Sequence, residues 1–437
     1  MKLNEHIVKG IEKDISPFYY YDLKVLEETL MTVKNESSKY NYKVHYAVKA
    51  NFNPKIMRLI SNYGFGADCV SGNEIIHALK MGFSSNDIVL AGVGKTDREI
   101  RLALENNIFC LNVESLEELK IINNIALDMG KFAPVALRLN PNINAKTHHY
   151  ITTGLSENKF GIPLTMLDNI LDEIQTMDNI YLKGLHFHIG SQITDLTVYE
   201  DLCKQVNEIQ IDLEKRNINL DHINVGGGLG INYNNPDDSE AYNVSNYFAL
   251  FDKYLDKRPN QSLHFEIGRS IVGTCGSLIT KVLFVKKGIQ TDFVVVDAGM
   301  TELIRPALYQ SYHQINNLSS LDESCRYHVV GPICESSDCF GKNIILPKTR
   351  RGDIIAIRSA GAYGQVMSSR YNLRSTAPAL YSDGTKVGFD DKQLFPDSIF
   401  TDKDHFLTPA RAARMKPTAG VWLASRVPGS WIQADLC

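Results

Sequence analysis

The stretch from residue 43 to residue 91, KVHYAVKANFNPKIMRLISNYGFGADCVSGNEIIHALKMGFSSNDIVLA, decides the fold. Short runs rich in β-branched or aromatic residues alternate in it with longer segments whose apolar residues recur at the helical period. The short runs are 43–48, 65–69 and 87–91, and the helical segments are 53–62 and 71–81. Alternating strands and helices are typical of a parallel sheet with crossover helices.

The same alternation continues along the chain to about residue 270. Further strands are predicted at 108–112, 133–139, 182–188, 222–226 and 262–266. Further helices are predicted at 96–105, 114–129, 163–177, 195–216 and 240–257. Eight strands with intervening helices over about 225 residues are typical of a (β/α)8 barrel, whose active-site groups lie at the C-terminal ends of the strands. An open, doubly wound sheet would give a similar pattern and is the alternative fold.

The hydrophobic pattern of the sequence changes after residue 270, because helical periodicity largely disappears. Strands are predicted there at 271–286, 292–298, 326–333 and 353–358. This indicates a second, β-rich domain. We expect the aromatic run FYYYD at 18–22 to join it.

The predicted fold class is therefore α/β, a (β/α)8 barrel with a second, mostly β domain. The barrel is predicted to occupy residues 22–268, and the β-rich domain residues 1–21 plus 269–395. Residues 396–437 contain both tryptophans and the run PARAARMKP, and we predict a tail that is disordered or was added to the natural protein.

Composition excludes several classes of partner. The 437 residues include 46 basic and 50 acidic side chains, a formal charge of −4, so no basic surplus exists for nucleic acid or an anionic membrane. No uncharged apolar run is long enough to span a bilayer, and charges interrupt the N-terminal segment where a signal peptide needs an apolar core. Eight cysteines without a CxxC pair indicate thiols in a reducing compartment. We predict a cytoplasmic protein.

Lys49 follows the first barrel strand directly in YAVKAN, so its side chain should project into the barrel mouth. Burial there would lower its pKa and favour Schiff-base chemistry. The plain alternative is a surface lysine at a strand end.

Two glycine-containing loops follow the seventh and eighth strands. They are GGGLGI at 226–231 and EIGRS at 266–270, in the loops where barrel enzymes commonly bind a phosphate. Glycines let backbone N–H groups approach phosphate oxygens without a Cβ in the way. A lysine for an imine, a phosphate cradle and the carboxylate of Glu266 in one barrel mouth indicate pyridoxal phosphate as the cofactor.

Several blocks of this chain, in order, resemble those of the fold-type III pyridoxal-phosphate decarboxylases, and most closely the branch that acts on diaminopimelate. The resemblance runs from about residue 17 to about residue 375. The blocks are YAVKAN, GADCVSG, TTGLSENKFGI, HFHIGSQ, NVGGGLG, DAGMTELIRPALY, GPICESSD and AGAYG. The resemblance implies a homodimer with active sites at the subunit interface.

The resemblance also implies roles around the cofactor. Lys49 would hold it as a Schiff base, His188 would lie against one face of the pyridine ring, and Glu266 would face the ring nitrogen. A carboxylate there keeps the nitrogen protonated and makes the ring an electron sink, whereas an arginine would suit a racemase. The phosphate and the surroundings of the cofactor would be contacted by Asp68, Ser191, Gly227, Gly228, Gly268, Arg269 and Tyr363.

The expected substrate is meso-diaminopimelate, which has an amino-acid group at each end. By resemblance, Arg269, Arg305 and Tyr309, with Tyr363, would bind the carboxylates, a task that suits the guanidinium fork. Glu335 would meet the distal ammonium, and Cys334 would protonate the carbanion or shape the site across the dimer interface. No metal site is predicted, because the CESSDC run has no second pair of ligands.

Three residues depart from the family pattern. Ile267 stands where many relatives have proline, Asn73 where they have glycine, and Phe52 where they have a smaller residue. Phe52 could alter substrate preference. Two other functions stay open: a related amino-acid or carboxynorspermidine-type decarboxylase, and a non-catalytic homologue that uses the barrel as a binding module.

Overall fold

The computed structural model describes residues 15–143, 159–238, 243–383 and 387–389. Its first sheet is a closed ring of eight parallel strands. The strands in ring order are β2 (Lys43–Ala47), β3 (Gly66–Cys69), β4 (Ile88–Leu90), β5 (Cys110–Val113), β6 (Ala133–Asn140), β8 (Ile180–His186), β9 (His222–Asn224) and β10 (Ser262–Ile267). The pairing of β10 with β2 closes the ring. The barrel prediction is therefore confirmed, and the open sheet is excluded. The two-residue strand β7 (Ile162–Pro163) pairs with the end of β6.

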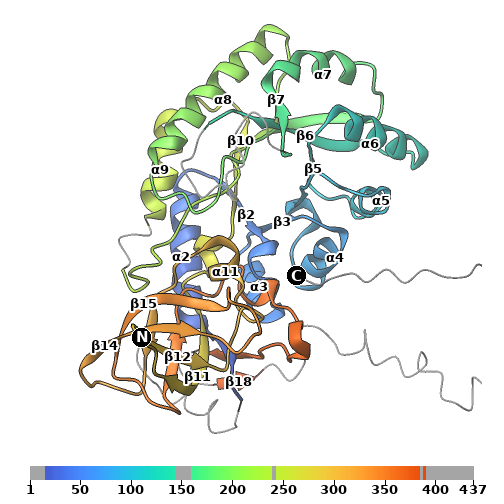
Figure 1. Ribbon diagram of the computed structural model, residues 1–437. Coiled ribbons are helices and arrows are strands. Elements are labelled where there is room, and N and C mark those ends of the chain that lie inside the picture. The colour runs from blue at the N-terminus through green and yellow to red at the C-terminus, as the bar shows by residue number, and fades with distance from the viewer. Residues whose placement is uncertain (1–14, 144–158, 239–242, 384–386, 390–437) are drawn as a thin grey trace, which may run out of the picture. The chain divides into compact units, whose positions relative to one another are not determined.

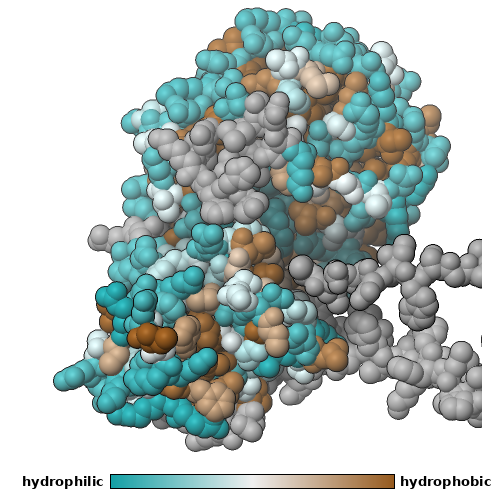
Figure 2. Space-filling model, in the orientation of Figure 1, coloured by the Kyte–Doolittle hydropathy of each residue, from teal (hydrophilic) through white to brown (hydrophobic). Residues whose placement is uncertain are grey.

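Helices surround the barrel in the order that the sequence predicted (Figure 1). They are α3 (Pro54–Asn62), α4 (Gly72–Lys80), α5 (Asp97–Glu105), α6 (Leu116–Asp128), α7 (Leu167–Ile174), α8 (Thr197–Lys215) and α9 (Val244–Tyr254). Local chemistry sets their ends: Pro54 occupies the first turn of α3, and Thr96 and Glu99 form a reciprocal capping box at the start of α5. The outer faces of α7 and α8 are mainly hydrophilic, as expected for amphipathic helices on a barrel (Figure 2).

The sequence reading missed one long helix, α2 (Leu23–Lys39). Its side-chain cap is Asp22, which accepts hydrogen bonds from the backbone N–H groups of Lys24 and Val25. Leu26 and Leu30 lie on its buried face. Leu23, Leu26, Leu30 and Val33 recur at the helical period, so the pattern of this helix is present in the sequence.

The inside of the barrel is unusual toward the N-terminal ends of the strands. His45, His222 and His264 are buried there, on β2, β9 and β10. The ring centroid of His264 lies 5.0 Å from that of His45 and 4.9 Å from that of His222, and Phe109 packs against His264 at 5.0 Å. Branched aliphatic residues usually fill such layers.

The second sheet is mostly antiparallel, and it contains the N-terminal strand. Its main order is β15 (Cys339–Pro347), β14 (Ser324–Val330), β12 (Asp292–Val296), β11 (Gly276–Lys286), β1 (Phe18–Asp22), β17 (Ala379–Ser382) and β18 (Val387–Phe389). Strand β16 (Ile354–Ile357) pairs with both β11 and β13 (Ile315–Asn317). The placement of FYYYD in this sheet is confirmed, because β1 pairs with β11 and β17.

Parts of the second sheet differ from the sequence prediction. The strand predicted from residue 271 begins at Gly276, because a short helix, α10 (Arg269–Val272), comes first. Strands β13, β15, β17 and β18 were not predicted. The proposed domain bounds stay a prediction, and the predicted tail at 396–437 lies outside the described residues.

Hydrogen bonds join the barrel mouth to the second sheet. Asn51 donates through Nδ2 to the hydroxyl of Tyr21 at 3.1 Å and to the carbonyl of Gly361 at 2.9 Å. The backbone N–H of Tyr363 donates to the carbonyl of Ala50 at 2.8 Å. Tyr363 has a φ of 55°, a left-handed conformation that is costly for a bulky residue, so the surroundings hold it in place. These contacts bring Tyr363 next to the turn that contains Lys49.

Candidate active site

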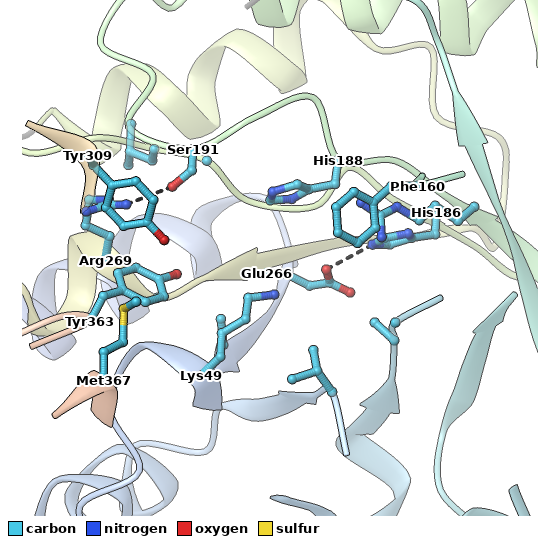
Figure 3. Close-up of a pocket in the computed structure, with 18 of the residues that line it drawn as sticks. Lys49, Phe160, His186, His188, Ser191, Glu266, Arg269, Tyr309, Tyr363 and Met367 are labelled. Carbon is cyan, nitrogen blue, oxygen red and sulfur yellow. Dashed lines mark hydrogen bonds and ion pairs between the residues drawn. The ribbon is translucent and has the colours of Figure 1, made fainter. Parts of the chain in front are cut away.

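A cavity of about 410 Å³ opens at the C-terminal ends of the barrel strands (Figure 3). Its wall comes from the barrel and from segments that connect strands of the second sheet. Of the residues singled out from the sequence, the lining includes Lys49, His188, Ser191, Gly228, Glu266, Gly268, Arg269, Arg305, Tyr309 and Tyr363. Positions widely separated in the chain therefore meet in one cavity, as the barrel topology requires.

Lys49 lies in a single 3₁₀ turn, Val48–Ala50, directly after β2. Its Nζ donates to Oδ2 of the buried Asp68 at 3.0 Å. Burial by itself would lower the pKa of Lys49, but the charge of Asp68, with Tyr363 and Glu266 nearby, outweighs it and raises the pKa. The expectation that burial lowers this pKa is therefore wrong, because the charges of Asp68 and Glu266 beside the amine outweigh the effect of burial.

Glu266 on β10 accepts three hydrogen bonds from side chains inside the barrel. His186 lies 2.9 Å from Oε2, and the amides of Asn224 and Asn112 donate to Oε1 at 2.7 and 3.1 Å. Burial by itself would raise the pKa of Glu266, but the attraction and hydrogen bond of His186, with the charge of Lys49, hold it well below its usual range. Glu266 is thus an ionised carboxylate facing the cavity.

The glycines of the loop after β9 are required by close backbone packing. A Cβ on Gly227 would lie 1.9 Å from the carbonyl oxygen of Glu266. Gly228 has a φ of +100°, and a Cβ on it would lie 2.5 Å from the carbonyl oxygen of Gly190. A Cβ on Gly268 would come 2.9 Å from that of Ala47. The backbone of both loops therefore approaches the cavity in a way that other residues would block.

Arg269 lies across this loop and is held by two hydroxyl groups. It donates to Oγ of Ser191 at 2.9 Å and to the hydroxyl of Tyr233 at 2.6 Å. Its guanidinium carbon lies 4.8 Å from the centre of the Tyr363 ring. A buried cation whose described partners are two hydroxyls and an aromatic face is suited to binding an anion.

His188 presents a neutral ring to the cavity. Burial lowers its pKa well below the usual value, and the charges of Arg138 and Lys49 lower it further. Its Nδ1 accepts from the backbone N–H of Gly227 at 3.4 Å. A neutral imidazole held at its edge can lie flat against an aromatic ring.

Arg305 is a second buried cation in the cavity wall. Its guanidinium carbon lies 5.8, 5.6 and 5.9 Å from the ring centres of Tyr233, Tyr309 and Tyr363. Burial lowers its pKa. Within the described part of the chain no carboxylate pairs with Arg305, and its Nε has no hydrogen-bond partner. A buried guanidinium in this state is poised for an incoming carboxylate.

Cys334 and Glu335 are not part of the cavity lining. Both are exposed at the surface, where the backbone N–H of Cys334 donates to Asn372 at 3.3 Å and the Tyr371 hydroxyl donates to Glu335 at 2.8 Å. Asp68 and Gly227 also do not line the cavity, but they contact residues that do.

The residues that depart from the family pattern lie outside the cavity lining. The Phe52 ring packs edge-on against His77, with 6.5 Å between ring centres. Asn73 lies in a separate groove beside α4 and α5. Ile267 is buried at the end of β10.

Several site residues were missed from the sequence. Asn112 and Asn224 lie on inward-facing strand positions, and Arg138 lines the cavity while its NH1 group lies 2.6 Å from Oε1 of Glu114. A polar residue inside a predicted buried strand was the available signal for the two asparagines. Phe160 and Met367 complete the wall, and no local pattern indicated them.

In the part of the chain that the structure describes, no group of three histidine, cysteine or carboxylate side chains could hold a metal ion. None of the described helices is both long and apolar enough to cross a membrane.

The site fits pyridoxal phosphate at three points. Lys49 can form the covalent bond, the ionised Glu266 can face the ring nitrogen, and the glycine loops with Ser191 and Arg269 make a cradle that a Cβ would fill. Fold and site thus define a barrel enzyme that works with this cofactor.

Comparison with known proteins identifies the class and then the family. Residues 23–273 match the family model described as pyridoxal-dependent decarboxylase, pyridoxal binding domain, and the chain is therefore a decarboxylase of this class whose cofactor is pyridoxal phosphate. It is 55% identical over 369 residues to diaminopimelate decarboxylase of Bacteroides thetaiotaomicron, covering 84% of this chain and 96% of that protein. The crystal structure of diaminopimelate decarboxylase from Helicobacter pylori complexed with L-lysine has a TM-score of 0.83 and 39% identity, covering 88% of this chain and 95% of that one. The chain belongs to the diaminopimelate decarboxylase family.

Proposed function

We propose that this protein removes the carboxylate at the D-configured centre of meso-diaminopimelate, giving L-lysine and CO₂. The observation that carries the choice of substrate is Arg305, a buried guanidinium without an ion-pair partner among the described residues, in the same cavity as Lys49. A substrate with a second carboxylate supplies the missing anion, whereas ornithine or lysine does not. The membership in the diaminopimelate decarboxylase family supports the same choice.

In the proposed mechanism Lys49 would hold the cofactor covalently through its Nζ. Pyridoxal phosphate, when bound, supplies an electron sink for the bond that breaks. Glu266 supports positive charge at the ring nitrogen, and the neutral ring of His188 excludes water from one face. Arg305 and Tyr309 orient the distal carboxylate. The carbon–carbon bond to the departing carboxylate breaks, CO₂ leaves, and a proton taken up from solvent takes its place on the carbon.

The test is lysine and CO₂ formation from meso-diaminopimelate with added pyridoxal phosphate. L,L-diaminopimelate, ornithine, arginine and carboxynorspermidine are assayed in parallel. Turnover of the meso isomer alone supports the proposal. Faster turnover of a substrate without a distal carboxylate would exclude the proposed role of Arg305.

We further propose a homodimer that completes each site. Cys334 and Glu335 are exposed and outside the cavity of their own subunit. Nearby in the chain, Leu373 is 97% exposed and Tyr371 is 48% exposed, and both would be covered by a partner subunit at this surface. We propose that this surface contacts a second copy and that Cys334 and Glu335 reach the site of the partner subunit.

Subunit complementation tests this arrangement. Lys49→Ala and Cys334→Ala subunits are each expected to be almost inactive. Refolded as an equal mixture, they should recover about a quarter of wild-type activity, because half the dimers are mixed and each has one intact site. A mixture that forms mixed dimers and stays inactive would contradict shared sites.

We also propose a cytoplasmic location. The seven cysteines among the described residues are free thiols, as expected in a reducing compartment. Cell fractionation with a specific antibody tests it, and recovery outside the cytoplasm would exclude it.

A further inference from the structure

We propose that His186, Asn224 and Asn112 form a three-donor clamp that leaves Glu266, among the residues that the structure describes, a single free acceptor site, and that this site requires the cofactor's ring nitrogen to carry a proton. The three are positioning residues, because they act through Glu266. The inference concerns the cofactor, and its consequence for turnover rests on the proposed function.

The three donors of the clamp and Glu266 are all buried inside the barrel. Asn112 and Asn224 are completely buried, His186 is 1% exposed and Glu266 is 6% exposed. The donors come from three different strands, β5, β8 and β9, while Glu266 lies on β10. In Figure 3 the His186 ring points at the Glu266 carboxylate, on the side away from Arg269 and Tyr309. Bulk water does not compete for these hydrogen bonds.

The orientation of Asn224 is fixed by a second contact. Its Oδ1 accepts from the backbone N–H of Gly226 at 2.9 Å, so Nδ2 must be the atom that faces Glu266 at 2.7 Å. The backbone N–H of Glu266 in turn donates to the carbonyl of Gly226 at 2.7 Å. Asn224 therefore links the glycine loop to the carboxylate.

His186 has one partner. Its Nε2 lies 2.9 Å from Oε2 of Glu266, and its Nδ1 has no hydrogen-bond partner among the described residues. Because an ionised carboxylate only accepts, Nε2 must carry the hydrogen. No other described contact of the ring competes with the one to Glu266.

The acceptor count then determines what Glu266 can bind. A carboxylate offers about four lone-pair sites, and the two amides and His186 use three of them. The remaining site accepts a hydrogen and repels a lone pair. A protonated ring nitrogen satisfies it, whereas an unprotonated one would bring two acceptors together in a buried site.

The experiment removes one donor and restores it. His186→Leu deletes the donor, and His186→Gln returns an N–H donor in a similar volume. His264→Leu is the matched control, because it removes a buried imidazole from the same barrel without touching Glu266. The absorbance spectrum of each variant loaded with pyridoxal phosphate is recorded from about pH 6 to about pH 9, without substrate.

We expect the spectra of the wild type and of His264→Leu to keep their form across this range. The spectrum of His186→Leu should change with pH, and His186→Gln should restore the wild-type form. With substrate, kcat of His186→Leu should fall about 10- to 100-fold, as expected for loss of a hydrogen bond to a charged group, with KM changed less than about threefold.

A second variant keeps the inference testable if His186→Leu does not load cofactor. Asn224→Asp preserves shape and replaces a donor by an acceptor, so its spectrum should show the same pH dependence. Wild-type spectra in both His186→Leu and Asn224→Asp would overturn the clamp. The spectra need no substrate, so a wild type that made no lysine would contradict the proposed function and leave this result intact.

Discussion

Replacing His222 by phenylalanine should make the protein less sensitive to acid. The His222 ring is completely buried, and neither nitrogen has a hydrogen-bond partner among the described residues. It packs edge-on against Phe109 and fits over Gly184, where a Cβ would come 2.5 Å from Cε1 and Nδ1 of the His222 ring. An aromatic ring without nitrogens fits the same contacts and leaves no polar group unpaired.

The size of the effect follows from proton binding. Burial lowers the pKa of His222 to about 3, and the charge of Lys183 and the neighbouring His45 contribute. The unfolded chain has a histidine pKa of about 6.5, so the unfolded state binds a proton that the folded state excludes as pH falls from about 6.5 toward 3. Stability is lost in that window. Between pH 7.5 and pH 5.5 the loss from this one residue is about 1.4 kcal/mol.

The assay is equilibrium urea unfolding at both pH values, with fixed protein and cofactor concentrations. His222→Phe should be about 1.4 kcal/mol more stable relative to wild type at pH 5.5 than at pH 7.5. Any packing cost of the larger ring is the same at both pH values and cancels. Ile223→Val, on the same strand, is the control, and its cost of about 1 kcal/mol should not depend on pH. Equal effects of His222→Phe at both pH values would refute the reasoning.

Three further predictions concern the active site. Lys49→Ala should lower kcat, measured by CO₂ release, at least about a thousandfold, which corresponds to a loss of about 4 kcal/mol of transition-state stabilisation. Normal turnover would exclude Lys49 as the lysine that holds the cofactor. Arg305→Lys keeps the charge and loses the fork, so KM for meso-diaminopimelate should rise about 10- to 100-fold in initial-rate assays, and an unchanged KM would count against distal carboxylate binding. Gly227→Ala places a Cβ 1.9 Å from the carbonyl oxygen of Glu266. Gly227→Ala should destabilise the protein by about 3 kcal/mol and abolish cofactor binding, whereas Gly94→Ala should do neither. Retained cofactor binding in Gly227→Ala would show that the loop can move. Gly94 serves as the control because nothing lies within 4 Å of its added Cβ.

The sequence determined the order and type of the barrel elements. The strands and helices of the barrel have local sequence signals, such as the apolar run at 88–90 or the helix cap at Thr96. These signals do not depend on the rest of the chain. The roles of Lys49 and Glu266 could be predicted for the same reason. Lys49 directly follows one predicted strand, and Glu266 is the last residue of another. Among the missed strands of the second sheet, β17 pairs with β1, whose residues lie at the other end of the described chain, so no local pattern reveals that pairing.

Tertiary structure alone decided the electrostatics of the site. Lys49 has a raised pKa because the fold brings the carboxylates of Asp68 and Glu266 close to its amine, and no single segment of sequence contains all three residues. The clamp on Glu266 likewise joins residues from β5, β8 and β9, whose separation along the chain hides their contact. Secondary structure depends on near neighbours in the chain, whereas the charge of a buried group depends on which distant groups the closed barrel places within a few ångströms of it.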